Sequence, residues 1–434
     1  MLPSDQPTLK KALNALHIWA LAVGLVISGE YFGWNYGWGV AGTVGFLLAT
    51  LLVTVLYVTF IFSFTELTAS IPNAGGPFAY ACKALGPYGG VVAGYVTLIE
   101  FVFAPPAIAF ALGAYVHFLY PGIATLDCAV ACYLLFTGIN LLGIKESAAF
   151  NLFVTVLAVA ELLLFMGIVA PHFEMKRFLA NPVPLEPGRI FAAIPFAIWL
   201  YLGIEGVAMV AEEAKDPQRT IPRGYLWGIL TLVALALGVM VLSGGVGDWR
   251  ALSKMDYPLP ETIATVLGHG NVFTKLFAGI GLFGLIASFH GLIIGYSRQI
   301  FALSRSGFLP AVLSRVNRRF QTPHWALVSG GLVGILTLYT GTTGQVITLS
   351  ALGAVSMYII SMVSLLKMGR REVPVFKTPF YPWFPRIALG LSVLCLLAML
   401  WYNQALGAGF FGCLLLALVL FRVLGGTRRY RIDL

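Results

Sequence analysis

The stretch VISGEYFGWNYG, residues 26–37, places three glycines and Glu30 inside a long apolar run. The whole chain of 434 residues is similarly apolar, with 59% hydrophobic and 10% charged residues and a mean hydropathy of +0.88. This composition lies outside the range of soluble globular proteins and is typical of an integral membrane protein. The run is therefore predicted to cross a bilayer, although glycine weakens a helix and a carboxylate in lipid is costly.

Twelve apolar segments of roughly the twenty residues that a bilayer requires follow one another along the chain. They cover residues 14–39, 41–65, 89–119, 125–143, 149–170, 190–211, 224–246, 272–303, 325–341, 346–367, 386–403 and 407–424. Each segment is continuously apolar, which argues against the alternating pattern of a transmembrane β-barrel. The sequence therefore predicts an all-α integral membrane protein with 12 transmembrane helices.

The basic residues are unequally divided between the two sides of these segments. If the N-terminus is cytoplasmic, 21 of the 27 Lys and Arg residues lie on the cytoplasmic side. Positively charged loops stay in the cytoplasm, so both termini are expected there, in a multi-pass protein of the plasma membrane or inner membrane. The net charge of +9 reflects this bias, and we expect no nucleic-acid partner.

A second interruption occurs in the stretch IWLYLGIEG, residues 198–206. It combines Gly203 and Glu205 with two aromatic residues. A transmembrane helix that unwinds exposes amide and carbonyl groups, which then need water, a substrate or an ion as partners. We therefore expect Ser28-Gly29 and Leu202-Gly203 to be non-helical and to line a binding site.

The two interrupted segments are five segments apart, as the first helices of two five-helix inverted repeats would be. This spacing predicts a first repeat at 14–170, a second at 190–367, and two additional C-terminal helices at 386–424. Interrupted helices at corresponding positions of two repeats are typical of the central site of a transporter.

Four glutamates lie within the apolar segments: Glu30, Glu100, Glu161 and Glu205. Each charged residue at a helix centre costs about 2.5–3.5 kcal/mol if it faces lipid, so all four are expected to face the interior. There they either hold the bundle together by interhelical hydrogen bonds or line a polar path for a solute or proton. The histidines and cysteines form no catalytic or metal-ligand motif, so we expect no enzyme, metal site or cofactor.

Four loop stretches resemble the cytoplasmic-loop signatures of the amino acid, polyamine and organocation (APC) transporters. They are FTELTASIPNAGGPFAYA (64–81), EEAKDPQRTIPRG (212–224), SRQIFALSRSGFLPAVLSRVNRRFQTPHWAL (297–327) and FKTPFYPWFPR (376–386). Within that superfamily, VISGEYFGWNYGW (26–38) and LIEFVFAPPAIAFALGAY (98–115) resemble the bacterial ethanolamine permeases. The resemblance implies a five-plus-five inverted repeat with two additional helices, with the first and sixth helices broken, working by alternating access.

The resemblance also implies a substrate site. Ser28 and Gly29 match a glycine-rich turn whose amides bind an amino-acid carboxylate in most relatives, but Glu30 replaces the usual aliphatic residue. A carboxylate there repels a substrate carboxylate and attracts an ammonium group. Glu100 corresponds to a position near the pocket, and Trp199 matches an aromatic gate next to Gly203. The hydroxyl of Tyr201 is free to bond either to the pocket or to another helix.

Three residues are candidates for proton coupling. Glu205 matches a glutamate implicated in proton sensing in relatives, while Glu161 lies one turn beyond Ala158, the position of a coupling lysine in some proton-driven relatives. His290 could line the same cavity, or could bridge packed helices without any such role.

We keep three hypotheses open: a permease for ethanolamine or another small amine, an amino-acid permease working as a proton symporter or exchanger, and a nutrient sensor built on a transporter fold. A sensor usually adds a soluble domain or a long tail, whereas both tails here are short, which disfavours it. The expected partners are therefore a small-molecule amine, a coupling proton and membrane lipid. The sequence does not determine the oligomeric state.

Overall fold

The computed structural model describes residues 11–73, 75–143, 148–180, 183–369 and 376–423. Leu424, both ends of the chain and seven of the Lys and Arg residues used for orientation lie outside these ranges. Within them, nine helical spans are long and apolar enough to cross a membrane. They are α3 (Tyr36–Ser70), α5 (Pro87–Leu119), α7 (Ala148–Val169) with η1 (Ala170–His172), α10 (Ile194–Trp199) with η2 (Ile204–Glu213), α11 (Pro217–Gly244), α14 (Val272–Arg305), α16 (Thr343–Met368), α17 (Trp383–Tyr402) and α18 (Gln404–Val423).

Three shorter helices are also apolar: α1 (Ala15–Val26), α6 (Thr125–Leu141) and α15 (His324–Thr340). The remaining elements are short helices in the connections and at the first break. They are α2 (Ser28–Tyr31), α4 (Pro77–Leu85), α8 (Met175–Leu179), α9 (Pro187–Ala192), α12 (Trp249–Leu252), α13 (Pro258–Leu267) and η3 (Ala311–Ser314). The only extended pairing in the described part of the chain is a single β-bridge between Leu13 and Ala214.

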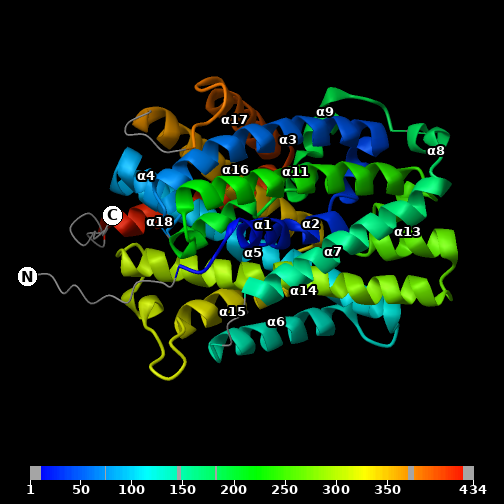
Figure 1. The fold of residues 1–434 in the computed structure, drawn as a ribbon, viewed down its shortest axis with the longest axis horizontal. Helices are drawn as coiled ribbons and strands as arrows, with labels where there is room; N and C mark the ends of the chain where they lie inside the picture. The colour runs from blue at the N-terminus through cyan, green and yellow to red at the C-terminus, as the bar shows by residue number, and fades with distance from the viewer. Residues whose placement is uncertain (1–10, 74, 144–147, 181–182, 370–375, 424–434) are drawn as a thin grey trace, which may run out of the picture.

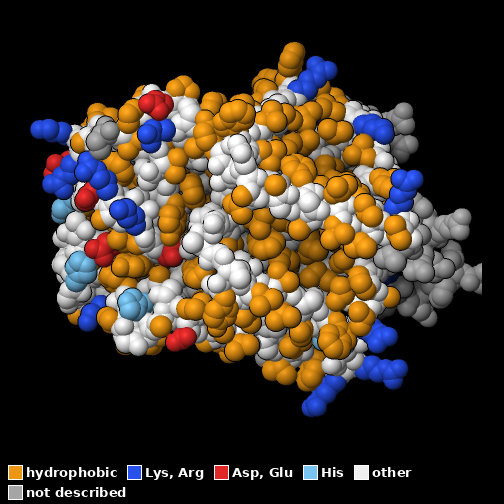
Figure 2. All heavy atoms as spheres, turned by 180° about the vertical axis from the view of Figure 1, so that it is seen from behind, with side chains coloured by type: hydrophobic (Ala, Val, Ile, Leu, Met, Phe, Trp, Pro, Cys, Tyr) orange, Lys and Arg blue, Asp and Glu red, His pale blue; other side chains and the backbone are white. Residues whose placement is uncertain are grey.

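The long helices run side by side along the longest dimension of the molecule (Figure 1). α5 packs against both α14 and α16, and α1 packs against α11, so segments far apart in the sequence enclose the two interrupted regions. Figure 2 shows a broad apolar surface between two ends at which charged side chains gather. This distribution and the apolar helices identify a multi-pass membrane protein.

A serine side chain interrupts the first helix. The hydroxyl of Ser288 on α14 donates to the carbonyl oxygen of Gly24 at 2.7 Å and accepts from the amide of Ser28 at 3.1 Å. It therefore takes the place of the helical bond between residues 24 and 28, which separates α1 from α2. Our expectation that Ser28-Gly29 is non-helical was wrong, because both residues lie in the single turn of α2 and the non-helical residues follow it at 32–35.

The chain turns again at Gly42, inside the span assigned to α3. Gly42 has φ of +69° and ψ of 179°, which is not a helical conformation and is readily adopted only by glycine. The kink separates residues 36–41 from the long helix that follows, close to the boundary between residues 39 and 41 that the sequence predicts.

The second interruption lies where the sequence predicts it. α10 ends at Trp199, residues 200–203 form a turn, and Gly203 adopts a left-handed φ of +102° before η2 begins. η2 is a 3-10 helix of ten residues, which is unusually long for this less stable geometry. Leu202-Gly203 is thus non-helical and enclosed by the bundle.

Replacing Ser288 with alanine should destabilise the protein, because the Ser28 amide and the Gly24 carbonyl would lose their partner away from water. An unpaired buried polar group costs about 1–3 kcal/mol, so the apparent melting temperature of the purified protein should fall clearly. Ser297→Ala is the matched control, since the Ser297 hydroxyl bonds only to the Ile294 carbonyl of its own helix. Equal melting temperatures for the two variants would contradict the bridging role of Ser288.

Candidate functional site

The two interrupted segments touch each other directly. A β-carbon on Gly29 would lie 2.4 Å from the carbonyl oxygen of Trp199, and one on Gly33 would lie 2.4 Å from the indole nitrogen of the same residue. The Trp199 indole donates to the carbonyl of Phe32 at 3.0 Å. Glycine at both positions therefore allows the turn around residues 29–33 to lie against the end of α10.

Glu30 lies on α2 at this contact and is completely buried. Neither of its carboxylate oxygens has a hydrogen-bond partner among the described residues, whereas its backbone carbonyl accepts from the Trp34 indole at 3.0 Å. Tyr201 lies within electrostatic range of the Glu30 carboxylate. Removing a lone carboxylate from water costs several kcal/mol, so this position demands a cation or a proton as its partner.

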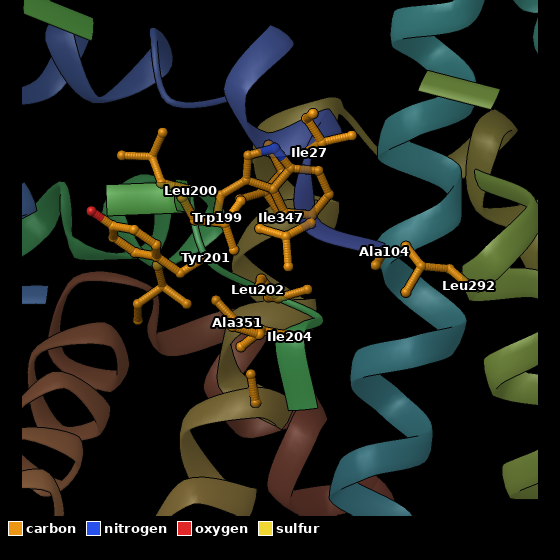
Figure 3. Packing of buried hydrophobic residues seen from close by; sticks show 14 of the residues in the cluster. Ile27, Ala104, Trp199, Leu200, Tyr201, Leu202, Ile204, Leu292, Ile347 and Ala351 are labelled. Carbon is orange, nitrogen blue, oxygen red and sulfur yellow. The ribbon is translucent and has the colours of Figure 1, made fainter. Parts of the chain in front are cut away.

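Trp199 and Tyr201 point to different sides of the second interruption (Figure 3). The Trp199 ring lies beside Ile27 and Ile347 (Figure 3), while the Tyr201 hydroxyl forms a 2.7 Å hydrogen bond with Thr54 on α3. Of the two roles left open for the Tyr201 hydroxyl, the structure shows the bond to another helix. Trp199 packs against the turn that carries Glu30, so its indole ring borders the space beside the Glu30 side chain.

Glu100 on α5 and Glu205 on η2 form a second buried cluster. Their carboxyl groups lie close enough to influence each other's charge, although neither oxygen of Glu100 has a hydrogen-bond partner in the described ranges. The hydroxyl of Tyr358 on α16 donates to Glu205 at 3.4 Å and shares a 2.7 Å hydrogen bond with the hydroxyl of Tyr57. Two adjacent buried carboxyl groups strongly disfavour double ionisation, so this cluster is suited to holding a proton. Sequence reasoning missed Tyr57 and Tyr358, which no local motif marks.

The other two coupling candidates lie apart from this cluster. Glu161 on α7 accepts a 2.7 Å hydrogen bond from Tyr31, which follows Glu30 in α2, and the Tyr115 hydroxyl donates to the Tyr31 carbonyl at 3.3 Å. His290 is buried on α14, with its ring 5.7 Å from that of Phe136 on α6. No group of three His, Cys, Asp or Glu side chains in the described ranges could hold a metal ion.

At one end of the bundle, the segment before α1 is bonded to the chain after η2. The amides of Ala12 and Leu13 donate to the Glu213 carbonyl at 2.9 and 3.0 Å, and the Lys215 amide donates to Leu13 at 3.0 Å. Arg298 on α14 adds an ion pair with Glu213 at 3.5 Å. These bonds tie the segment before the first interruption to the chain that follows the second one.

At the opposite end, the connection between α11 and α13 is bonded to the residues that follow the first interruption. The side-chain Nδ2 of Asn35 donates to the backbone carbonyls of Leu252 and Met255 at 2.6 and 2.8 Å. Asp256 in the same connection accepts hydrogen bonds from Tyr36 at 2.7 Å and from Thr343, at the start of α16, at 3.0 Å. Glu30 itself has no exposed surface, so bulk solvent does not touch its side chain in this structure.

The environment of Asp256 also makes the stability of these hydrogen bonds depend on pH. Asp256 lies in a connection outside the membrane-spanning helices, and burial raises the pKa of its carboxyl above the usual value, although the bonds from Tyr36 and Thr343 act in the opposite direction. The surroundings of Asp256 in the folded protein therefore favour the protonated carboxyl.

Comparison with known proteins places these features in context. Residues 13–420 match the amino acid permease family. The chain is 28% identical to an uncharacterized transporter of Rhizobium meliloti over 404 residues, which are 90% of this chain and 86% of that protein. It is 23% identical to a branched-chain amino acid permease of Bacillus subtilis and 26% identical to a gamma-aminobutyric acid permease of Escherichia coli, in each case over 92% of this chain and 90% of the relative.

The contribution of Asp256 to stability should decrease as pH rises. Because the pKa of Asp256 is raised in the folded protein, the folded state binds this proton more tightly than the unfolded state does. The resulting stabilisation is fully present below the ordinary aspartate pKa and is lost as pH rises through the raised pKa. The difference in apparent melting temperature between the wild type and Asp256→Asn should therefore shift against the wild type between acidic and neutral pH. Asp248→Asn, at the N-terminus of α12, is the control. A difference that grows in favour of the wild type would show the opposite linkage.

Proposed function

The chain belongs to the amino acid permease family, and from that premise we propose that it takes up a small cationic amine, most simply ethanolamine, across the plasma membrane. The family and the apolar helices make it a multi-pass membrane transporter, and the names of its relatives speak for a transporter and not an enzyme. What we propose is the identity of the substrate, the inward direction of transport and the location in the plasma membrane.

The proposed substrate is inferred mainly from the unpartnered carboxylate of Glu30. It is fully buried beside the contact between the two interrupted segments, and neither oxygen has a hydrogen-bond partner in the described part of the protein. A bound ammonium group would supply both a charge and hydrogen-bond donors to it. A substrate carboxylate at the same position would add a like charge. Ethanolamine, with an ammonium group, a hydroxyl and no carboxylate, fits these requirements.

The remaining parts of the proposed site follow from the geometry around Glu30. We assign substrate contact to Ser28, Gly29, Glu30, Trp199 and Gly203, which line the two interruptions, and keep Tyr201 as a nearby residue tied to α3. An aromatic face over a partly desolvated ammonium contributes about 1–2 kcal/mol, which suits Trp199 for closing over the substrate. We keep Glu100 as a substrate-binding candidate, which would act through the negative charge that it shares with Glu205.

We propose that transport is coupled to protons at the Glu100–Glu205 pair. The pair is buried and connected through Tyr358 to Tyr57, so a change in its protonation alters hydrogen bonds between η2, α16 and α3. Glu161 is a further candidate because it bonds to Tyr31 in the interrupted helix. His290 is the third, although its contact with Phe136 speaks for packing between helices.

The architecture that we propose has twelve crossings arranged as two inverted repeats, 14–170 and 190–367, followed by helices at 386–424. The interrupted helices α1–α2 and α10–η2 would then begin the two repeats. Alternating access would proceed by opening one end of the bundle at a time, with both termini in the cytoplasm.

An amino-acid permease of the same fold is the second candidate. Two relatives are named as permeases for branched-chain amino acids and gamma-aminobutyric acid, and both cover most of this chain. Substrates of that kind carry a carboxylate, which would have to lie beside Glu30 or be bound after Glu30 has accepted a proton. Competition between ethanolamine and serine separates the two candidates, because serine is ethanolamine with an added carboxylate.

Excess unlabelled ethanolamine should abolish uptake of labelled ethanolamine into proteoliposomes, while serine at the same concentration should compete at least about tenfold less well. At an effective dielectric of about 20, two charges roughly 4 Å apart interact by about 4 kcal/mol, and a third of that gives tenfold discrimination. Equal competition by serine would favour the amino-acid permease.

Glu30→Gln should lose ethanolamine uptake while the protein still inserts and elutes as a folded species, because the amide keeps the size of the side chain and removes its charge. Glu261→Gln, in α13 away from the interruptions, is the matched control and should transport normally. Normal uptake by Glu30→Gln would make Glu30 a structural residue.

Lys215 and Arg318 should both face the cytoplasm, since the segments that contain them carry most of the basic residues. Cysteines introduced at these two positions should not react with a membrane-impermeant maleimide added to intact cells, whereas a cysteine at Lys254, in the opposite connection, should react. Labelling of Lys215→Cys or Arg318→Cys from outside would reverse the proposed orientation.

A further inference from the structure

A cavity of about 170 Å³ lies between α7 and α14, on the outside of the bundle. Its walls are almost entirely apolar and include Leu164, Phe273 and Leu276, whose side chains are more than half exposed on the surface of the described protein. Since this surface belongs to the apolar region between the charged ends, the cavity opens toward lipid and not toward the central site.

One ionisable side chain lines this apolar cavity. Glu161 is 4% exposed, and its Oε2 atom accepts the hydrogen bond from Tyr31. Its Oε1 atom is buried and has no hydrogen-bond partner in the described ranges. A carboxyl group beside hydrocarbon is costly unless a donor pairs with it, and the walls of the cavity offer no donor.

The size and depth of the cavity limit what can fill it. An apolar cavity of about 150 Å³ holds a molecule as large as benzene, so the space admits roughly six to eight carbon atoms. Glu161 lies eight residues before Val169 at the end of α7, which is about 12 Å along the helix. The headgroup of a phospholipid anchored at the membrane surface would have to leave the interface to reach that depth.

We propose that this cavity is a second binding site, which takes a hydrophobic primary amine of about six to eight carbons. The nitrogen pairs with the Glu161 carboxyl group, whose Oε1 atom turns from its buried position beside Gly281 toward the cavity, and the hydrocarbon portion packs against Leu164, Phe277 and Ile280. The neutral amine enters from lipid, and a proton passes from the protonated Glu161 carboxyl to the nitrogen, so the carboxylate and ammonium form together. The pair has no net charge, which avoids burying an isolated ion.

An amine bound at this site would affect the interrupted helix through the hydrogen bond between Tyr31 and Glu161. The Tyr31 hydroxyl bonds to the same carboxyl group, and Tyr31 is the last residue of α2, directly after Glu30. A hydrophobic amine at Glu161 therefore modulates the interrupted helix from the lipid side, at a place separate from the Glu30 contact. The binding itself does not depend on which solute the central site carries.

A photoreactive primary amine with a six-carbon chain and a terminal diazirine tests the proposal on the full chain in proteoliposomes. After illumination, mass spectrometry should find adducts within residues 157–168 and 273–280. Excess hexylamine should remove these adducts, whereas an equal concentration of 1-hexanol should leave most of them, because the alcohol has the same chain without the basic nitrogen. Excess ethanolamine should leave them unchanged.

Two variants test separately whether binding needs the Glu161 carboxyl group and whether it needs the empty volume of the cavity. Glu161→Gln should lower labelling at least fivefold with the cavity intact, and Ala160→Phe should abolish it by filling the cavity with Glu161 intact. Leu163→Phe, on an exposed position of the same helix that does not line the cavity, should label like the wild type. The competition experiment with hexylamine and hexanol uses the wild-type protein, so it tests the need for a basic nitrogen even if Glu161→Gln fails to fold.

Three outcomes would overturn the inference. Equal competition by hexanol, or full labelling of Glu161→Gln, would mean that the cavity holds any apolar molecule, including a lipid chain. Loss of labelling with ethanolamine would mean that the probe occupies the transport path and not a separate site. None of these outcomes bears on ethanolamine uptake, which is measured without the probe.

Discussion

Every backbone amide and carbonyl in a lipid environment needs a partner within the protein, and this constraint determines how two helices can stop at the centre of the bundle. Ser288 supplies both halves of the missing bond between Gly24 and Ser28. The Trp199 indole takes the carbonyl of Phe32, and the Asn35 side chain accepts from the Gly33 amide. The interruptions are therefore built from long-range partners, and the loss of one partner weakens the helix that it terminates.

The buried carboxyl groups differ mainly in how many partners the protein gives them. Glu161 and Glu205 each accept a tyrosine hydroxyl, and Glu205 also lies beside Glu100. The carboxyl oxygens of Glu30, like those of Glu100, have no hydrogen-bond partner in the described part of the chain, and Glu30 has no neighbouring carboxyl group with which to share a proton as Glu100 does. Because an unpaired buried charge is strongly destabilising, a protein that keeps Glu30 in this state gains something from it that packing cannot supply. The same reasoning distinguishes Oε1 of Glu161, which is unpartnered, from Oε2, which already serves the structure.

Local patterns in the sequence were sufficient for the helical class, for the approximate helix positions and for the turn at Leu202-Gly203. These features depend on hydropathy and on glycine, which act over a few residues. The place of the break between α1 and α2 was not predictable, because it depends on a serine 260 positions away. The same holds for the Tyr201–Thr54 bond and for Asp256, whose partners Tyr36 and Thr343 come from distant helices. Nothing in the local sequence marks these pairings.

The first interrupted segment carries closing contacts at both ends of the bundle. Leu13, before α1, is bonded to the chain after η2, whereas Tyr36, after the interruption, is bonded to Asp256 in the opposite connection. A continuous helix would transmit a movement at one end directly to the other. Here the serine bridge at Gly24 and the turn at 32–35 separate the two halves, so one set of contacts can open while the other stays closed. In the proposed function, a substrate paired with Glu30 would lie between these halves, where its charge would act on the contacts at both ends.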